Sequence, residues 1–472
     1  MSGKDDYILS PQSQYDEGGS HQKKDTLSCQ MNCYPADSYH SQTVGVRGPV
    51  TMQDNVLHEK LGDFVHSKII ERRVHVKGYG AFGYFQTINS MRKYTKLCFL
   101  QTPGHQVPVT VRFSFATGNQ GTPDTTRTAR GFSTKFYTEE GIFDLLCNHL
   151  PVIFVRDGMR FPDAIAAFSP SPVNNLIYPE TLWSFIARAP EATHFITRAF
   201  SDAGTLKSFC HMPGFSVNTY VWKNSEDVRR YVKYKWVPLA GEQYIDRQEA
   251  TMLAAKNPNI AGQELYDTIE SGIPVQYELW VQLMNPDDEC NLSFDPLDPT
   301  KVWDEQQYPL MLVGRLVLNQ NTWNFMEQVE KIAFSPANLL EGAELSNDKL
   351  LQSRANIYWD AQRRRLGPDF RKIPINYQEN WTPNSLVTSG DGEYVEGHLT
   401  RSGLSNPDDF TQAGQYYHSL STVQKNHLVD NLASDLSAVS WEIQKIVLGY
   451  FHNASAELGA RVAEQISVYS KR

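Results

Sequence analysis

Long apolar runs, paired cysteines and an excess of basic residues are all absent from this chain of 472 residues. No apolar run reaches the roughly 18 residues that a membrane-spanning helix needs, so we expect no transmembrane segment. The chain carries 44 Lys and Arg against 53 Asp and Glu, a formal net charge of −9. Because nucleic acid and anionic membranes repel an acidic protein, neither is an expected partner.

Cysteine is scarce and scattered. Six cysteines without a C-x-x-C pair are far below the density of a disulfide scaffold, so we expect reduced thiols. The first residues also lack the apolar segment of a signal peptide, which favours an intracellular, cytoplasmic protein. The final tripeptide, Ser470-Lys471-Arg472, is close to the peroxisomal address S-K-L. It is a poor signal, because its last residue is charged.

The distribution of residue types divides the chain into four expected parts. Hydrophobic residues make up 40% and aromatic residues 12%, enough for a buried core. Residues 1–65 are polar and predict an N-terminal arm. Residues 66–320 have mostly β character and predict a closed antiparallel barrel with a helical insert near 178–200. Residues 321–420 predict a wrapping segment, and residues 421–472 a C-terminal helical domain, giving an α+β protein.

Candidate strands contain alternating or continuous apolar residues, and Gly, Pro or Asp bounds many of them. They cover residues 69–76, 82–87, 107–114, 131–137, 152–155, 219–222 and 277–283. Two helices are expected in the wrapping segment, at 324–333 and 346–366. The second has Ser346 or Asn347 as its N-cap and ends at Gly367.

A glycine-rich stretch from Gly78 to Gly83 matches the spacing G-x-G-x-x-G. A dinucleotide site needs a helix directly after this motif, whereas residues 84–87 continue as a strand. We therefore exclude that site. Glycines within a strand more often mark a bend in a barrel or a close approach to a ligand.

One face of the expected helix at 346–366 carries Arg354, Tyr358 and Arg365, which fall within roughly 40° of each other. A solvated basic stripe is one interpretation. The other is chemical: an arginine one turn from a tyrosine favours the phenolate, because an opposite charge stabilises the ionised form. A phenolate can bind ferric iron, and the second arginine can pair with a porphyrin propionate.

Several motifs, which follow one another in a fixed order along the sequence, indicate the function of this helix. They are Arg73-Val74-His75-Val76-Lys77-Gly78, Val111-Arg112-Phe113-Ser114, residues 130–137, and Arg354-x-x-x-Tyr358-x-Asp360-x-x-Arg363-x-Arg365. Together they resemble the monofunctional haem catalases of the small-subunit type, from about residue 30 to residue 463. The resemblance implies haem b inside an antiparallel β-barrel, completed by a wrapping segment and a helical C-terminal domain.

The resemblance also implies the roles of individual residues. His75 is the distal acid/base, Asn148 is its hydrogen-bonding partner, and Ser114 lies behind His75. Tyr358 is the axial ligand of the iron, held ionised by Arg354. The remaining residues that contact the cofactor are the propionate-pairing Arg72, Arg112 and Arg365, and Phe161, which packs near the haem.

The sequence departs from the family along the expected substrate channel. Thr128 replaces an Asp that helps to orient peroxide, and its loss should slow peroxide turnover. Ala116 replaces a Val, which widens the approach to His75. Ala164 and Phe168 stand in a stretch where the family has polar and basic residues, so the lining becomes more apolar.

The family's nucleotide site is also altered. Ala203, Val237 and Glu305 stand where the family has Arg, Lys and His. Loss of basic groups and gain of a carboxylate disfavour a 2′-phosphate, so the sequence leaves NADPH binding open.

Three functions remain open at this stage. The first is a haem oxidoreductase that activates peroxide or superoxide for an oxidative cyclisation step of alkaloid-type specialised biosynthesis, with residual hydrogen peroxide disproportionation. Catalase-like enzymes of ergot-alkaloid pathways are similar in length, and their substrate is a small organic precursor. The second is an ordinary catalase, and the third is a non-enzymatic haem-binding protein. We expect a homo-oligomer, a dimer or tetramer.

Overall fold

The computed structural model describes residues 39–379, 396–404 and 407–470. The chain divides into two compact units, residues 1–69 and 70–472. In the first unit, helix α1 (Asn55–His66) begins after Asp54, whose carboxylate accepts a hydrogen bond from the Leu57 amide at 3.0 Å. Lys471 and Arg472, which belong to the address-like tripeptide, lie outside the described residues.

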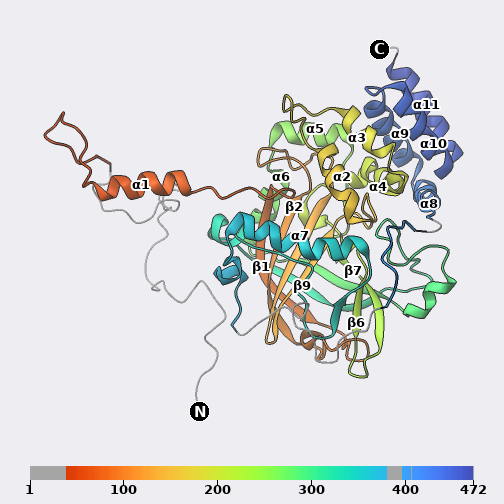
Figure 1. The fold of residues 1–472 in the computed structure, drawn as a ribbon, viewed down its shortest axis with the longest axis horizontal. Coiled ribbons are helices and arrows are strands. Elements are labelled where there is room, and N and C mark those ends of the chain that lie inside the picture. Colours follow the sequence, from red (N-terminus) through yellow and green to blue (C-terminus); the bar gives the residue numbers. More distant parts are fainter. Residues whose placement is uncertain (1–38, 380–395, 405–406, 471–472) are drawn as a thin grey trace. The chain divides into compact units, whose positions relative to one another are not determined.

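A closed antiparallel β-barrel forms the centre of the second unit (Figure 1). Its strands follow one another in the order β7-β5-β4-β3-β2-β1-β9-β8, and β8 pairs with β7 to close the ring. They are β1 (Gly78–Thr87), β2 (Gln106–Phe115), β3 (Arg130–Thr138), β4 (Gly141–Asn148), β5 (Gly214–Phe215), β7 (Arg229–Pro238), β8 (Val275–Met284) and β9 (Met311–Asn321). The short strands β6 (Tyr220–Lys223) and β10 (Ala343–Leu345) extend the sheet from β7. The α+β class with a closed barrel is therefore confirmed.

Aromatic side chains fill the barrel. Phe132 stacks on Trp236 with ring centroids 5.6 Å apart, and Phe113 stacks on Phe209 at 5.0 Å. All four side chains are buried. Burying one such side chain stabilises the fold by about 1.5–3 kcal/mol, so this cluster holds the strands in a fixed register.

The glycine-rich stretch lies within β1 and meets the predicted need for a bend. The register of β1 against β9 shifts between Phe82 and Gly83. A Cβ atom on Gly83 would lie 1.8 Å from the Val317 carbonyl oxygen, so no other residue fits there. Strand structure continues to Thr87, so a strand follows the glycine stretch instead of the helix that a dinucleotide site requires.

Helices pack against the barrel, and some of them form a second core. They are α2 (Phe161–Phe168), α3 (Pro179–Ile186), α4 (Thr193–Phe200), α5 (Arg247–Lys256), α6 (Ile260–Glu270), α7 (Lys349–Leu366), α8 (Thr411–Ser419), α9 (Thr422–Leu436), α10 (Trp441–Ala454) and α11 (Ala456–Tyr469). Apolar residues of α2–α4 pack with those of α8–α11 in one cluster. The insert near 178–200 therefore joins the C-terminal helices (Figure 1). No helix in the described part of the chain has the length and apolar character needed to cross a membrane.

The predictions of two strands and one helix are wrong. Residues 69–76 and 152–155 form no strand, and only the π-helical turn Met326–Glu330 occupies the stretch expected as a helix at 324–333. Residues 152–155 are buried in the helical core rather than in the sheet, and a short apolar run does not distinguish these environments. The expected boundaries of the four parts stay a prediction.

Candidate active site

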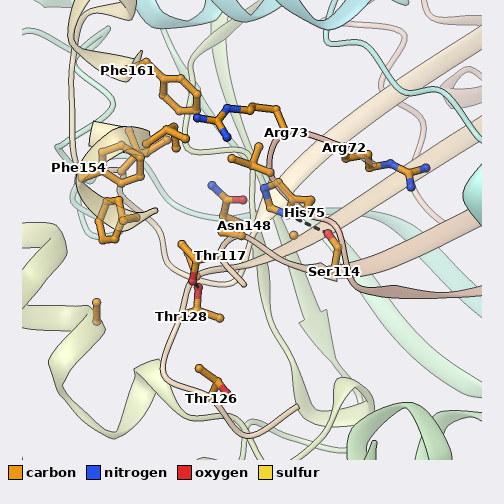
Figure 2. A pocket seen from close by; sticks show the side chains of 18 of the residues that line it. Arg72, Arg73, His75, Ser114, Thr117, Thr126, Thr128, Asn148, Phe154 and Phe161 are labelled. Carbon is orange, nitrogen blue, oxygen red and sulfur yellow. Dashed lines mark hydrogen bonds between the residues drawn. The ribbon is translucent and has the colours of Figure 1, made fainter. Parts of the chain in front are cut away.

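A cavity of about 1380 Å³ lies between the barrel strands and the helices (Figure 2). It is lined by segments that are far apart in the sequence. The predicted site residues that line it are Arg72, His75, Arg112, Ser114, Ala116, Thr128, Asn148, Phe161, Phe168, Arg354, Tyr358 and Arg365. The fold therefore brings most of the expected constellation to one place, while the role of each residue stays a prediction.

His75 lies just before β1 in an unusual backbone conformation. Its φ of 61° is in the left-handed region, which a non-glycine residue rarely adopts and which commonly marks a functional site. Its Nδ1 lies 2.9 Å from the Ser114 hydroxyl oxygen (Figure 2). A Cβ on Gly131 would lie 2.6 Å from that hydroxyl and 3.0 Å from the His75 ring, so a glycine is required there. Ser114 and Gly131 together fix the imidazole, leaving Nε2 for a reactant.

The charge state of His75 follows from its surroundings. Burial lowers its pKa to about 3, and the nearby guanidinium groups of Arg112, Arg354 and Arg72 act in the same direction. The imidazole is therefore neutral at neutral pH. A neutral imidazole can accept a proton, which is what a general base must do.

Asn148 ends β4, where it lies opposite Gly131 of β3. Its side chain lies beside His75 (Figure 2). Within the described part of the chain, no side-chain hydrogen bond joins Asn148 to His75. The amide is thus placed to contact a small molecule next to the imidazole.

Tyr358 and Arg354 lie one turn apart on α7 and face the same cavity. Arg354 donates from Nη2 to the Tyr358 hydroxyl oxygen at 3.1 Å, and its guanidinium lies 5.4 Å from the ring centroid. A buried guanidinium in this position stabilises a negative charge on the phenol oxygen. Burial acts to lower the pKa of Arg354, but its interactions with Tyr358 and Tyr220 raise it, and the net direction is upward.

Two residues that the sequence analysis missed hold Arg354 in place. Arg354 also donates to the side-chain oxygen of the buried Asn218, and Asn218 donates to Asp348 at 2.6 Å. Asp348 caps α7 by accepting from the Leu350 amide at 2.9 Å, so the cap is neither Ser346 nor Asn347. The end of the helix at Gly367 is as predicted. Asp before the helix is an ordinary capping signal, but nothing local points to Asn218.

Arg72, Arg112 and Arg365 are three buried or nearly buried cations that surround one buried carboxylate, Glu330. Arg72 pairs with Glu330 at 2.8 Å, and Arg365 approaches it at 3.7 Å. Arg112 Nε has no hydrogen-bond partner among the described residues. Burial, followed by repulsion from Arg72, lowers the pKa of Arg365 to about 9.

The excess of positive charge in this cluster shows whether the cavity suits haem. Three guanidinium groups exceed one carboxylate by two positive charges, and the propionates of haem carry two negative charges. Buried charges that remain uncompensated are costly, so a bound dianion would stabilise this end of the cavity. The residues present therefore fit the group. Glu330 was missed by the sequence analysis, because it lies 258 residues from Arg72.

Small and aromatic residues line the approach to His75. Ala116 lies in the wall, and the Thr117 and Thr128 hydroxyls form a hydrogen bond of 2.7 Å with each other (Figure 2). Phe154 stacks with Phe161 at 5.9 Å between ring centroids. Because threonine hydroxyls are neutral, Thr117 and Thr128 present no negative charge to an entering molecule.

The prediction for Ala164 is wrong. Phe161, Ile165 and Phe168 line the cavity from one face of α2, as their spacing of four and three residues requires. Ala164 lies on another face, is fully buried in the helical core, and does not line the cavity.

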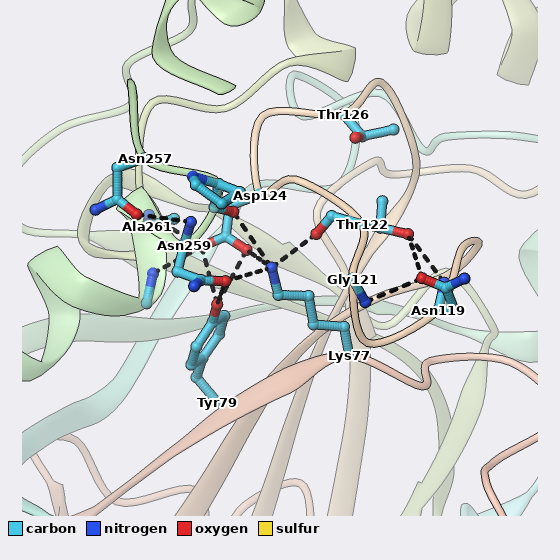
Figure 3. Close-up of polar contacts among 12 residues, drawn as sticks. Lys77, Tyr79, Asn119, Gly121, Thr122, Asp124, Thr126, Asn257, Asn259 and Ala261 are labelled. Carbon is cyan, nitrogen blue, oxygen red and sulfur yellow. Dashed lines mark hydrogen bonds and ion pairs between the residues drawn. The ribbon is translucent and has the colours of Figure 1, made fainter. Parts of the chain in front are cut away.

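A buried polar cluster anchors the loop that carries Thr126 and Thr128 (Figure 3). Asp124 pairs with Lys77 at 2.8 Å and accepts hydrogen bonds from the Tyr79 hydroxyl and from the first amides of α6. The Lys77 ammonium also donates to the Thr122 carbonyl at 2.7 Å. These contacts tie the channel loop to β1 and α6, so the channel wall is fixed.

Of the three residues expected at a nucleotide site, only one lines a second cavity. Glu305 lines a second cavity of about 280 Å³ and pairs with Lys235 at 2.8 Å. Ala203 and Val237 do not line it. Arg198 and Lys233 also line this cavity, so basic groups persist there although those three positions have lost theirs.

Comparison with known proteins agrees with this geometry. The family model described as Catalase matches residues 29–403, and the model described as Catalase-related immune-responsive matches residues 404–466. Catalase of Methanosarcina barkeri is 39% identical to this chain, in an alignment that covers 92% of this chain and 92% of the relative. Catalase-2 of Bacillus subtilis is 37% identical, covering 92% of this chain and 69% of its own length.

Solved structures of catalases are also similar to this chain. A bacterial catalase superposes with a TM-score of 0.86 at 33% identity, over 91% of this chain and 93% of that one. Catalase A from Saccharomyces cerevisiae gives a TM-score of 0.83 at 31% identity, over 91% and 96% of the two chains. The barrel and its cavity thus define a haem oxidoreductase. The chain belongs to the catalase family, whose members use peroxide and typically form oligomers.

Proposed function

We propose that this chain is a haem b enzyme that activates peroxide or superoxide to oxidise a small organic molecule. The reaction class we infer is an oxidative cyclisation in alkaloid-type biosynthesis, as in the catalase-like chanoclavine synthases, which the chain resembles. The observation that carries the proposal is the combination of retained and altered parts. The His75 and Tyr358 sides of the cavity are kept, while the approach has lost its carboxylate at Thr128 and is lined by apolar side chains.

The residues that would hold haem follow from the site geometry. Tyr358 would bind the iron through its phenol oxygen, which Arg354 contacts. Arg72, Arg112 and Arg365 would pair with the propionates. When bound, haem supplies an iron centre for the reduction of peroxide.

His75 moves the proton in this proposal. Its Nδ1 is engaged with Ser114, so Nε2 accepts a proton from the near oxygen of peroxide and returns it to the departing oxygen. The neutral state set by its low pKa makes the first transfer possible. Asn148 donates from its amide to the peroxide and orients it.

The size of the cavity supports an organic substrate. Ligand pockets usually hold about 300–1,000 Å³, and this cavity of about 1380 Å³ exceeds that range. A cofactor and a further small molecule therefore have room side by side. A wall rich in phenylalanine favours an apolar or aromatic body on that molecule.

An ordinary catalase is the second candidate. The presence of the entire expected distal and proximal set favours it, as do relatives that are named catalases. Both candidates predict that His75→Ala abolishes the reaction with peroxide while haem is retained. A non-enzymatic haem-binding protein would be unaffected by that change.

Oxygen release from hydrogen peroxide, normalised to haem content, separates the two candidates. Our proposal predicts intact haem with a kcat/KM several orders of magnitude below the diffusional ceiling of about 10⁸ M⁻¹s⁻¹. A value near that ceiling would establish the ordinary catalase and contradict the proposal. Sedimentation would test the proposed dimer or tetramer, and a monomer at micromolar concentration would contradict it.

A further inference from the structure

The second cavity, of about 280 Å³, has a buried lysine in its wall. Lys233 lies in β7, where it is paired with Gln282 of β8. Among the described residues, none lines both this cavity and the cavity of His75, and none that lines it takes part in the peroxide chemistry proposed above. Lys233 therefore belongs to a site of its own.

The amine of Lys233 has few partners. Its Nζ donates a hydrogen bond to the Lys301 carbonyl oxygen at 3.0 Å, and the Lys301 ammonium itself lies 3.8 Å from Asp298. Within the residues that the structure describes, no other hydrogen bond and no ion pair reaches Lys233 Nζ. An ammonium group has three donors, so two of them would be left without a protein partner. Because unpartnered donors in a buried place are costly, the surroundings favour the neutral amine.

The carboxylates near Lys233 act on it only through space. They are Asp348, Asp298 and Asp295, and each favours the ammonium form. Asp348 caps α7, while Asp298 pairs with Arg156 at 3.1 Å. Burial is the largest effect, and it lowers the pKa of Lys233 to about 8 despite these carboxylates.

Further titratable side chains lie at or beside this cavity. Lys235 and Glu305 both line it and pair with each other at 2.8 Å. Arg198 adds a positive charge, and its Nε donates to His194 at 2.8 Å. Burial lowers the pKa of His194, so this imidazole is neutral at neutral pH. These neighbours therefore do not restore the ammonium form of Lys233.

We propose that Lys233 is a covalent binding site for small aromatic aldehydes, which its amine captures as a Schiff base inside the second cavity. The amine nitrogen attacks the carbonyl carbon and forms a C=N bond. The carbonyl oxygen leaves as water with the two hydrogens of the amine, so the step needs no oxidant or reductant. A desolvated lysine in an apolar pocket is an established kind of nucleophile for this reaction. The assignment is independent of the function proposed for the haem site.

The walls of the second cavity suit an aromatic ring. Phe215, Tyr234 and Trp303 line it. The Trp303 ring centroid lies 5.4 Å from Lys233 Nζ, so a ring bonded to that nitrogen would contact the indole. Burial raises the pKa of Tyr234, so its phenol adds no charge. Aromatic aldehydes therefore match both the nucleophile and its surroundings.

Reductive trapping with benzaldehyde and sodium cyanoborohydride tests the assignment on the haem-loaded protein. Cyanoborohydride reduces the Schiff base to a stable secondary amine, and digestion followed by mass spectrometry locates each benzyl group. At pH 7.5 about a quarter of an amine with a pKa near 8 is neutral, against about 0.1% of an ordinary lysine. We therefore expect Lys233 to be labelled about 100-fold faster than the exposed lysines, with a rate that rises through a midpoint near pH 8.

The variant Lys233→Gln removes the nucleophile and keeps a side chain that can donate to the Lys301 carbonyl oxygen. Its fast labelling should be lost. Lys372→Gln is the matched control, because Lys372 is exposed, pairs with Asp369 and lines neither cavity. Labelling of Lys233 in this control should proceed at the unmodified rate.

Labelling of Lys233 no faster than that of the exposed lysines, or fast labelling located at a different residue, would overturn the assignment. Fast labelling that persists in Lys233→Gln would do the same. If that variant does not fold, the position of the benzyl group in the unmodified protein decides the matter. Because trapping needs no turnover at the haem, the result is independent of the oxygen-release assay.

Discussion

Substitution of Gly131 by alanine tests whether the position of the His75 ring controls the reaction with peroxide. The added Cβ would lie 2.6 Å from the Ser114 hydroxyl oxygen and 3.0 Å from the His75 ring. Ordinary contact begins near 3.4 Å, so the hydroxyl must move by about 0.8 Å and the ring by about 0.4 Å in a packed interior. The Ser114 hydroxyl oxygen and the His75 Nδ1 atom, both of which the added Cβ would crowd, form the hydrogen bond that orients the imidazole.

A displacement of this size has two expected consequences. Crowding costs about 1–3 kcal/mol of folding free energy. Misplacement of a proton-transferring group by up to ~1 Å lowers its rate by about 100-fold. Stopped-flow measurement of the haem-loaded Gly131→Ala variant with hydrogen peroxide should show this slowing, while the visible spectrum reports unchanged haem content.

Two companion variants sharpen the result. Gly131→Ala combined with Ser114→Ala removes the shortest contact and should regain part of the stability. Gly449→Ala is the control, because a Cβ there meets nothing within 4 Å. Unchanged peroxide kinetics in Gly131→Ala with intact haem would refute the reasoning that the glycine is kept to position His75.

Three further predictions concern the parts around this centre. Asn218→Ala leaves the buried Arg354 without one partner and should cost about 1–3 kcal/mol in denaturant unfolding, with an altered haem spectrum. Asp124→Asn breaks the pair with buried Lys77 and should cost about 3–5 kcal/mol, measured in the same way. Burial lowers the pKa of His149 to about 3 in the folded protein, so between that value and the ordinary 6.5 the unfolded chain binds more protons. Stability therefore falls as the pH drops, by about 2 kcal/mol from pH 6.5 to 5 for this group, and His149→Gln should lose correspondingly less.

Helix α7 could be predicted because the pattern that specifies it lies within a short stretch of the sequence. Arg354, Tyr358 and Arg365 repeat at helical spacing, and Gly367 ends the helix with a φ of 90°. The barrel strands were also largely predictable from apolar alternation. Register, closure and the fit of aromatic side chains inside the barrel depend on pairings between distant strands, which no local pattern contains.

The remainder of the site depends on long-range contacts. Asn218 reaches Arg354 across 136 residues, and Glu330 reaches Arg72 across 258. The left-handed backbone at His75 is imposed by its surroundings, since the apolar alternation of residues 69–76 resembles a strand. Ala164 was misplaced because a changed residue suggests a changed channel, whereas the orientation of a helix decides which of its residues face the cavity.

The distribution of charge along the cavity connects these observations to specificity. Arg72, Arg112 and Arg365 line one part of the wall, and Glu330, which pairs with Arg72, does not line it, so this part suits a molecule with two negative charges. Another part of the wall carries Arg127 and Arg247 together with Asp435, and the neutral His75 and Asn148 belong to neither part. Binding energy gained at a remote charged group can orient the reacting part of a substrate without altering the reacting centre. Such an arrangement allows a catalase barrel to accept an organic molecule while its proton-transferring residues stay unchanged.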